Sequence, residues 1–180
     1  MLEINIPERD QWDEVNEVFI KTESQTIRLE HSLLSLSKWE AKWHKYFLDN
    51  KDISNEELLD YIRCMTLTQN VDQNVYYNLT DENLKEVNEY IHNPMTATWF
   101  REINNRPPSR AIITSEVIYS WMVALQIPFE CEKWHLNRLM VLIRVCNENN
   151  QPKKKMNRRD VMNRNKALNE MRKQTYNTNG

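Results

Sequence analysis

The fold is decided by the stretch LLSLSKWEAKWHKYF, which covers residues 33–47. Large apolar side chains recur in it every three or four positions, at Leu33, Leu36, Trp39, Trp43 and Phe47. Residues at this spacing lie on one face of an α-helix, while the charged residues between them fall on the other faces. The stretch therefore predicts an amphipathic helix with a buried aromatic face.

The same helical pattern continues along the chain. Ser54 and Glu57 have the spacing of a capping box, in which each side chain accepts a hydrogen bond from the other residue's backbone amide. An apolar stripe follows at Leu58, Leu59, Ile62 and Met65. Thr80 is placed to cap a further helix, which Pro94 ends. These signals predict two more helices.

Two helices are also predicted in the second half of the chain. The first begins at Thr114 or Ser115, and Pro128 ends it. The second runs from about Glu130 to Asn147 and has a broad apolar surface. A helix of this kind is either deeply buried or faces a partner.

The N-terminal residues have a different period. Leu2, Ile4 and Ile6 alternate with polar residues, and 26–30 alternate in the same way. Residues 15–20 are rich in β-branched and aromatic side chains. Alternation with a period of two is typical of β-strands. Residues 1–30 are therefore expected to form a small β-hairpin.

Glycine is almost absent, since the only one is Gly180. Glycine allows positive φ angles and close approach of the backbone to a ligand. The chain consequently lacks a phosphate-binding loop, a dinucleotide-binding fingerprint, a nucleophile elbow and Asn-Gly hairpin turns. Asn is abundant and can replace glycine at helix C-termini. The fold class expected is mainly α, with a bundle-like helical body, the N-terminal hairpin and a basic C-terminal tail.

Charge divides the chain into a body and a tail. Residues 1–150 carry 15 Lys and Arg against 24 Asp and Glu, whereas residues 151–180 carry 9 against 2. We expect a helical body at 31–150, with a turn-rich break between two lobes at 101–113, and a tail at 151–180 that is a solvated helix or a disordered segment. The tail's first basic residues are Lys153, Lys154, Lys155, Arg158 and Arg159.

Two interpretations of this basic tail stay open. Its cations could neutralise phosphates in salt-sensitive, non-specific nucleic-acid binding. They could equally dock on an acidic protein or on the chain's own acidic body. Tyr176 is the only aromatic residue interleaved with the cations, so a stacking platform for single strands is missing.

No residues are assigned to catalysis, to a cofactor or to a metal. Cys131 and His135 are four positions apart and could face one metal ion, but a structural zinc site needs four ligands in short paired spacings. Cys64 and Cys146 have no nearby partner, and three widely spaced cysteines give no disulfide framework. A buried, reduced thiol is the favoured interpretation of each. The expectation is a protein without enzymatic activity, in the cytoplasm.

Membrane insertion and secretion are not expected. Charged residues interrupt every apolar stretch within a few positions, and the N-terminal residues MLEINIPERDQW lack the pattern of a secretory signal.

The chain has six tryptophans, which are dense for 180 residues. Large aromatic residues and Met are enriched where proteins bind partners. Around the turn at Ile127-Pro128 they gather at Trp121, Met122, Phe129 and Trp134. This helical hairpin is the predicted partner-binding surface, although burial in the core is the favoured explanation for any one of the four.

Several segments resemble the tail assembly chaperone-like proteins of long-tailed bacteriophages. They are HSLLSLSKWEAKW (31–43), YIRCMTL (61–67), PMTATWF (94–100), IYSWMVALQIPFE (118–130) and ALNEMRKQ (167–174). The resemblance is spread over most of the chain, and no single motif carries it.

The resemblance implies a concrete function. Such proteins bind the long helical tape measure protein in the host cell cytoplasm, keep it soluble and help to recruit tail tube protein. The family has no catalytic residues, and a homo-oligomer is compatible with it. Two alternatives remain: a structural tail or connector protein that is retained in the virion, and a nucleic-acid-binding regulator that uses the basic tail.

Overall fold

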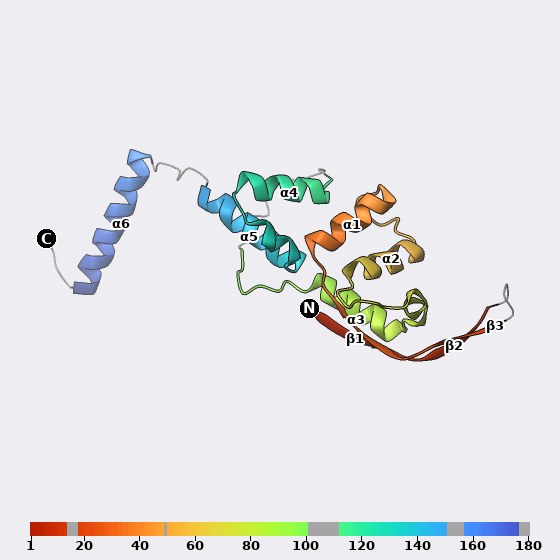
Figure 1. The fold of residues 1–180 in the computed structure, drawn as a ribbon. Helices are drawn as coiled ribbons and strands as arrows, with labels where there is room; N and C mark the ends of the chain where they lie inside the picture. Colours follow the sequence, from red (N-terminus) through yellow and green to blue (C-terminus); the bar gives the residue numbers. More distant parts are fainter. Residues whose placement is uncertain (14–17, 49, 101–111, 151–156, 177–180) are drawn as a thin grey trace. The chain divides into compact units, whose positions relative to one another are not determined.

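The computed structural model describes residues 1–13, 18–48, 50–100, 112–150 and 157–176 (Figure 1). The chain forms two compact units, Met1–Glu148 and Asn149–Gly180. Helices predominate among the described residues, and a small antiparallel β element precedes them. The expected mainly α fold is confirmed. Most of the break predicted at 101–113 lies outside the described residues.

The N-terminal hairpin has four short strands. β1 (Leu2–Ile6) pairs antiparallel with β4 (Gln25–Leu29), and β2 (Arg9–Asp13) pairs antiparallel with β3 (Val18–Thr22). Because the β2–β3 pair is nested between β1 and β4 in the sequence, the two pairs form one ribbon that runs out and back (Figure 1).

Side chains of β1 and β4 alternate between the core and solvent. The buried set is Ile4, Ile6, Ile27 and Leu29, and the residues between them are exposed. The hairpin lies against η1 (Gln73–Asn78) and α3 (Asp81–His92) through β1. The alternation of apolar and polar residues in the sequence thus matches the alternation of buried and exposed side chains in the strands.

Helix α1 (Leu33–Trp43) is the centre of the helical body. It packs against α2, α4 and η2. The remaining helices of this unit are α2 (Asn55–Met65), α4 (Ser115–Ala124), the 3₁₀ turn η2 (Phe129–Lys133) and α5 (Leu136–Asn150). The quoted stretch therefore supplies the element against which much of the body packs.

Capping boxes begin three of the helices. They pair Ser32 with Ser35, Ser54 with Glu57, and Thr80 with Asn83. The predicted box at Ser54 and the predicted cap at Thr80 are both confirmed. A cap of this type contributes about 1 kcal/mol because it satisfies amides that have no partner within the helix.

Helix α1 ends earlier than the apolar spacing suggests. His44 takes a left-handed conformation with φ 55°, so the chain leaves the helix before Phe47. The loop nevertheless returns the Phe47 ring to the core, with its centroid 5.0 Å from that of Trp39 and 3.8 Å from that of Tyr61. The predicted aromatic face was therefore right in its members but wrong in placing Phe47 on the helix.

Left-handed positions are not reserved for Asn. Positive φ angles occur at His44, Asn70, Met95 and Gln126 among the described residues. Asn93, which follows α3, has φ −65°. At the ends of α1 and α3, therefore, no Asn takes the left-handed conformation that glycine favours.

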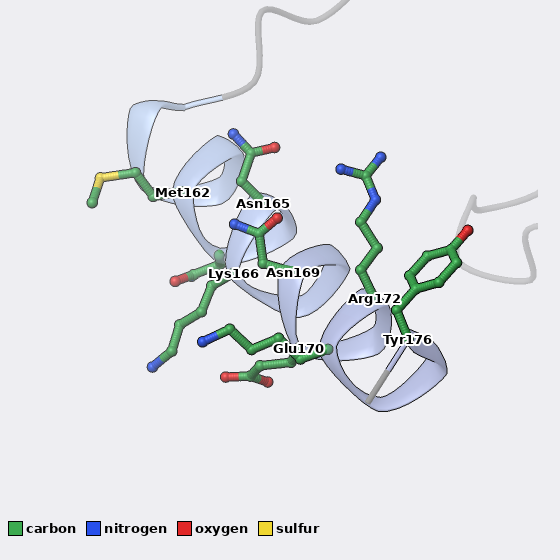
Figure 2. Close-up of a pocket in the computed structure, with 9 residues that line it drawn as sticks. Met162, Asn165, Lys166, Asn169, Glu170, Arg172 and Tyr176 are labelled. Carbon is green, nitrogen blue, oxygen red and sulfur yellow. The ribbon is translucent and has the colours of Figure 1, made fainter. Parts of the chain in front are cut away.

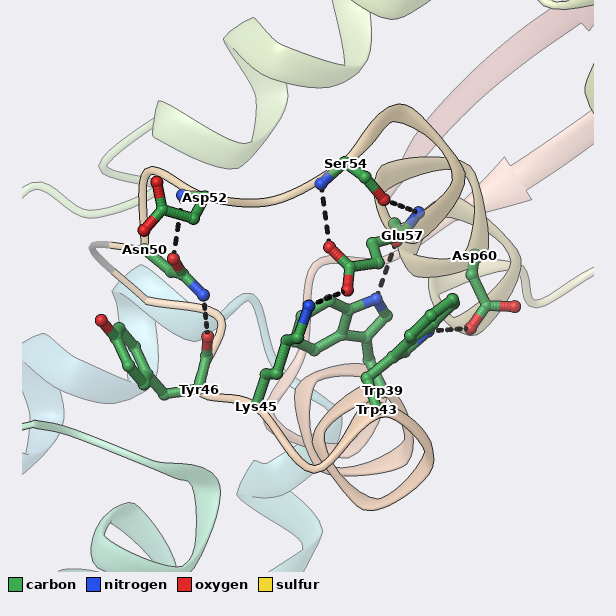
Figure 3. A network of polar contacts seen from close by, with 9 residues as sticks. All are labelled: Trp39, Trp43, Lys45, Tyr46, Asn50, Asp52, Ser54, Glu57 and Asp60. Carbon is green, nitrogen blue, oxygen red and sulfur yellow. Dashed lines mark hydrogen bonds and ion pairs between the residues drawn. The ribbon is translucent and has the colours of Figure 1, made fainter.

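Polar contacts join α1 and its loop to α2 (Figure 3). The Trp39 indole donates to the Glu57 carbonyl at 2.7 Å, and the Trp43 indole donates to the Asp60 carboxylate at 2.8 Å. Both carboxylate residues are buried. These two hydrogen bonds turn the side of α2 that carries Glu57, Asp60 and Tyr61 towards α1. Leu58, which was predicted to be buried, therefore lies at the surface and is 36% exposed.

The last helix of the body begins later than predicted. Residues 129–133 form η2, and α5 starts only at Leu136. His135 makes an isolated antiparallel bridge with Ser32, and the Leu136 amide donates to the His31 carbonyl at 2.7 Å. A backbone that pairs with another segment cannot also be helical there, which explains the later start.

The described part of the second unit is α6 (Arg158–Tyr176). All its side chains whose burial is described are exposed, including those of Val161, Met162, Leu168 and Met171. Of the two states expected for the tail, the structure gives the solvated helix.

Candidate partner-binding surface

Helix α4 is apolar on most of its circumference. Its sequence is SEVIYSWMVA, and only the side with Ser115, Ile118 and Met122 is buried. Val123 is 62% exposed, whereas Trp121 is partly buried against the core. An apolar helix that is covered on one side only still has apolar surface available to a partner.

The four predicted contact residues lie at different depths. Met122 is fully buried and packs with Ile118, one turn earlier, so it supports α4 from beneath and has no surface for a partner. Trp121 and Trp134 are partly buried, and Phe129 is 56% exposed. Of the four, only Phe129 is largely open to solvent.

Nor do the other three form one patch. The Phe129 ring lies against Tyr119, with 6.3 Å between the ring centroids. Trp121 is two residues from Tyr119 and therefore lies about 200° further around the helix axis. The Trp134 ring is covered by the Arg138 guanidinium, 4.4 Å from the ring centroid. Phe129 and Trp121 consequently lie on different sides of α4, and the predicted set does not form one patch.

We define the α4 patch as Tyr119, Val123 and Phe129. Tyr119 and Val123 are one helical turn apart, and the Tyr119–Phe129 contact adds the first residue of η2. The Tyr119 hydroxyl donates to the Glu132 carboxylate at 2.8 Å, which holds η2 against α4. Burial raises the pKa of Tyr119, and the hydrogen bond to Glu132 raises it further.

Two members of this patch were not predicted from the sequence. Tyr119 and Val123 were available in the sequence as an i, i+4 aromatic and aliphatic pair. The missing information was the contact between Tyr119 and Phe129, which depends on the position of η2 and leaves no period in the sequence of α4.

The start of α4 is held by a carboxylate from α1. Thr114 occupies the N-cap position but makes no capping hydrogen bond with its side chain. Instead, Glu40 accepts from the Ser115 amide at 2.7 Å through Oε2, and from the Phe47 amide at 3.2 Å through Oε1. Glu40 is buried, although it lies among the polar positions of the α1 pattern. This contact fixes α4, and with it the patch, relative to α1.

Cys131 and His135 do not share a helix. Cys131 is in η2 and His135 precedes α5, where its Nε2 lies 3.0 Å from the Tyr90 carbonyl oxygen. Burial raises the pKa of the Cys131 thiol. Within the described ranges no three His, Cys, Asp or Glu side chains are grouped as metal ligands would be. The contacts of both residues are those of core side chains.

A buried layer of titratable groups lies in the first unit and has no signal in the sequence. His31 Nδ1 is 2.6 Å from the Tyr61 hydroxyl, and the His31 ring lies 5.2 Å from that of His135. Burial, reinforced by the nearby imidazoles of His135 and His92, lowers the pKa of His31 to about 3. His31 is therefore neutral at physiological pH.

Two further contacts link this buried layer to the N-terminal amine. The Tyr90 hydroxyl donates to the Glu30 carboxylate at 2.7 Å, and the other oxygen of Glu30 lies 3.0 Å from the Met1 amine. Burial raises the pKa of Tyr90, as does the bond to Glu30. These contacts join the hairpin, α3 and the segment before α5.

The predicted basic residues are only partly within the described structure. Arg158 and Arg159 form the start of α6, whereas Lys153, Lys154 and Lys155 lie outside the described residues. Figure 2 shows a concave surface on α6 whose lining includes Lys166 and Arg172. All of its lining residues belong to this one helix, so it is open to solvent.

Comparisons of this chain with protein-family models, with curated proteins and with solved structures find no match. The likeness to tail assembly chaperones therefore rests on the sequence segments alone. None of the helices in the described residues has both the length and the apolar character required to cross a membrane.

Proposed function

We propose that the chain is a non-catalytic assembly chaperone of the phage tail type. It binds the tape measure protein and tail tube protein in the host cell cytoplasm while the tail is built. The observation that carries the proposal is the α4 patch, an exposed apolar surface on a helix whose other side is firmly held by the core.

The chemistry of the patch suits a helical client. An amphipathic helix binds by laying its apolar side against an apolar surface, with anchors at intervals of three or four residues. Phe129 offers an aromatic anchor and Val123 an aliphatic neighbour, and neither has to leave the core to make contact. The Glu40 contact keeps the patch in place before the client arrives, which lowers the entropy cost of binding.

The test is co-expression with a tape measure protein from the same genome, followed by affinity capture. We expect stoichiometric capture and a soluble client that is insoluble when expressed alone. The double variant Val123→Ala with Phe129→Ala should weaken client binding on the order of 10-fold or more if the patch contains a hot spot. Both residues are largely exposed, so the variant keeps its fold.

Two matched variants locate the surface. Trp99→Ala removes an aromatic side chain that is 87% exposed elsewhere in the same unit, and it should leave binding unchanged. Trp121→Ala with Trp134→Ala tests two of the residues first predicted from the sequence. A client that stays insoluble beside the folded wild-type chain contradicts the proposal, as does recovery of the chain at fixed stoichiometry in purified virions.

A further inference from the structure

The cations of α6 gather on one side of the helix. Successive residues are about 100° apart around an α-helix axis. On this basis five of the six Lys and Arg residues of α6 fall within an arc of about 140°, and the sixth, Arg164, falls on the opposite side. The five are Arg158, Arg159, Lys166, Arg172 and Lys173.

Amide side chains lie within the same arc. Figure 2 shows Asn165 and Asn169 one turn apart, between Arg172 on one side and Lys166 with Glu170 on the other. Together they make a concave and mainly cationic side, with Glu170 as its acidic member and Met162 and Tyr176 as its apolar ones. Every one of these side chains is exposed.

The opposite side of α6 is apolar but narrow. It carries Val161, Leu168 and Met171, and Arg164 lies among them. Helices that bind membrane surfaces place large aromatic and aliphatic residues on their apolar side. A stripe of three aliphatic side chains with an arginine among them fits a lipid surface poorly, so the cationic side is the better candidate for binding.

We propose that α6 binds double-stranded DNA through this cationic side, without sequence preference. The 19 residues of α6 extend roughly 28 Å, so its cations can reach several phosphates. Arg, Lys and Asn are side chains that commonly donate to phosphate oxygens. The major groove of B-DNA is wide enough for an α-helix, whereas that of duplex RNA is deep and narrow.

Other nucleic acids fit less well. Proteins that bind single strands without sequence preference stack successive bases on aromatic side chains. The cationic side of α6 offers only Tyr176, at the last residue of the helix. The DNA-binding surface belongs to the second unit and uses no residue of the α4 patch.

The test uses the full chain and a fluorescently labelled DNA duplex of about 24 base pairs, with binding followed by anisotropy between 50 and 200 mM KCl. Lys166→Gln with Lys173→Gln removes two cations from the proposed surface. Each lost phosphate contact should reduce the slope of log affinity against log salt by about 0.9, so the double variant should lose nearly 2. Its affinity at fixed salt should fall roughly 10-fold.

Arg164→Gln is the matched control, since it removes a cation of the same helix from the opposite side. It should preserve most of the affinity and the slope, and circular dichroism checks that α6 stays helical in both variants. An equal effect of Arg164→Gln overturns the proposal, as does binding without salt dependence. Competition by polyglutamate as strong as by duplex DNA would assign the surface to an acidic protein, and binding only to anionic lipid vesicles would assign it to a membrane.

Discussion

The carboxylate of Glu40 in α1 accepts a hydrogen bond from the backbone amide of Ser115, the first residue of α4, at a distance of 2.7 Å. Seventy-five positions separate the two residues in the sequence. The amides at a helix N-terminus have no partner within the helix and carry a partial positive charge, so a carboxylate there is stabilising. The other oxygen of Glu40 accepts from Phe47. One buried side chain thus closes the loop after α1 and fixes the start of α4.

Glu40→Gln should lower the free energy of unfolding by about 2 kcal/mol. The amide retains one acceptor oxygen but loses the second acceptor and the negative charge at the helix start. Urea denaturation followed by circular dichroism measures the change. Glu86→Gln, at an exposed position of α3, is the matched control and should change stability by less than about 0.5 kcal/mol. Equal losses in the two variants would mean that the Glu40 contact contributes nothing specific.

Trp39→Phe should cost about 2–3 kcal/mol of stability. Trp39 is fully buried, and its indole donates to the Glu57 carbonyl, so the substitution removes both a hydrogen bond and packed volume. Trp99→Phe makes the same chemical change at a side chain that is 87% exposed and should be nearly neutral. Chemical denaturation of the two variants measures both changes in stability. A similar loss of stability at the two positions would contradict the burial of Trp39 in an aromatic core.

The aromatic core and the helix starts could be predicted from the sequence because each has a local physical cause. Leu33, Leu36 and Trp39 have helical spacing and are all fully buried. Ser54 and Glu57 form their capping box within a single turn. Signals of this kind need no knowledge of distant residues.

The candidate site depended on contacts that are remote in the sequence. The Glu40 carboxylate reaches α4, and the bridge between Ser32 and His135 delays the start of α5. Neither contact leaves a periodic signal. Met122 was placed on the partner surface because large apolar residues gather around the Ile127-Pro128 turn, although it belongs to the core.

Stability should fall in mild acid because of His31. Its pKa is about 3 in the folded chain against 6.5 for the ordinary imidazole, so between these values the unfolded chain binds more protons. The stabilisation is complete above pH 6.5 and is lost progressively as the pH falls towards 3. Lowering the pH from 7.5 to 5.0 should cost roughly 2 kcal/mol from this residue alone. Burial lowers the pKa of His135 as well, which acts in the same direction.

Urea denaturation at the two pH values measures this loss. His31→Asn cannot take up the proton and should remove most of the difference, even if the variant is less stable at both pH values. His44→Asn replaces an exposed histidine at a left-handed position that Asn tolerates, so it should leave the difference intact. A pH dependence of undiminished size in His31→Asn would locate the titrating group elsewhere.

Met122→Ala and Val123→Ala should separate the two sides of α4. Met122 is fully buried, so its truncation leaves a cavity and should cost about 2–5 kcal/mol. Val123 is 62% exposed, and alanine favours helices, so its truncation should change stability by less than about 0.5 kcal/mol. Thermal and urea unfolding measure both changes, and the capture assay measures client binding by the stable Val123→Ala variant. A large loss of stability at Val123 would mean that this side of α4 is covered, and the α4 patch could then not receive a client helix.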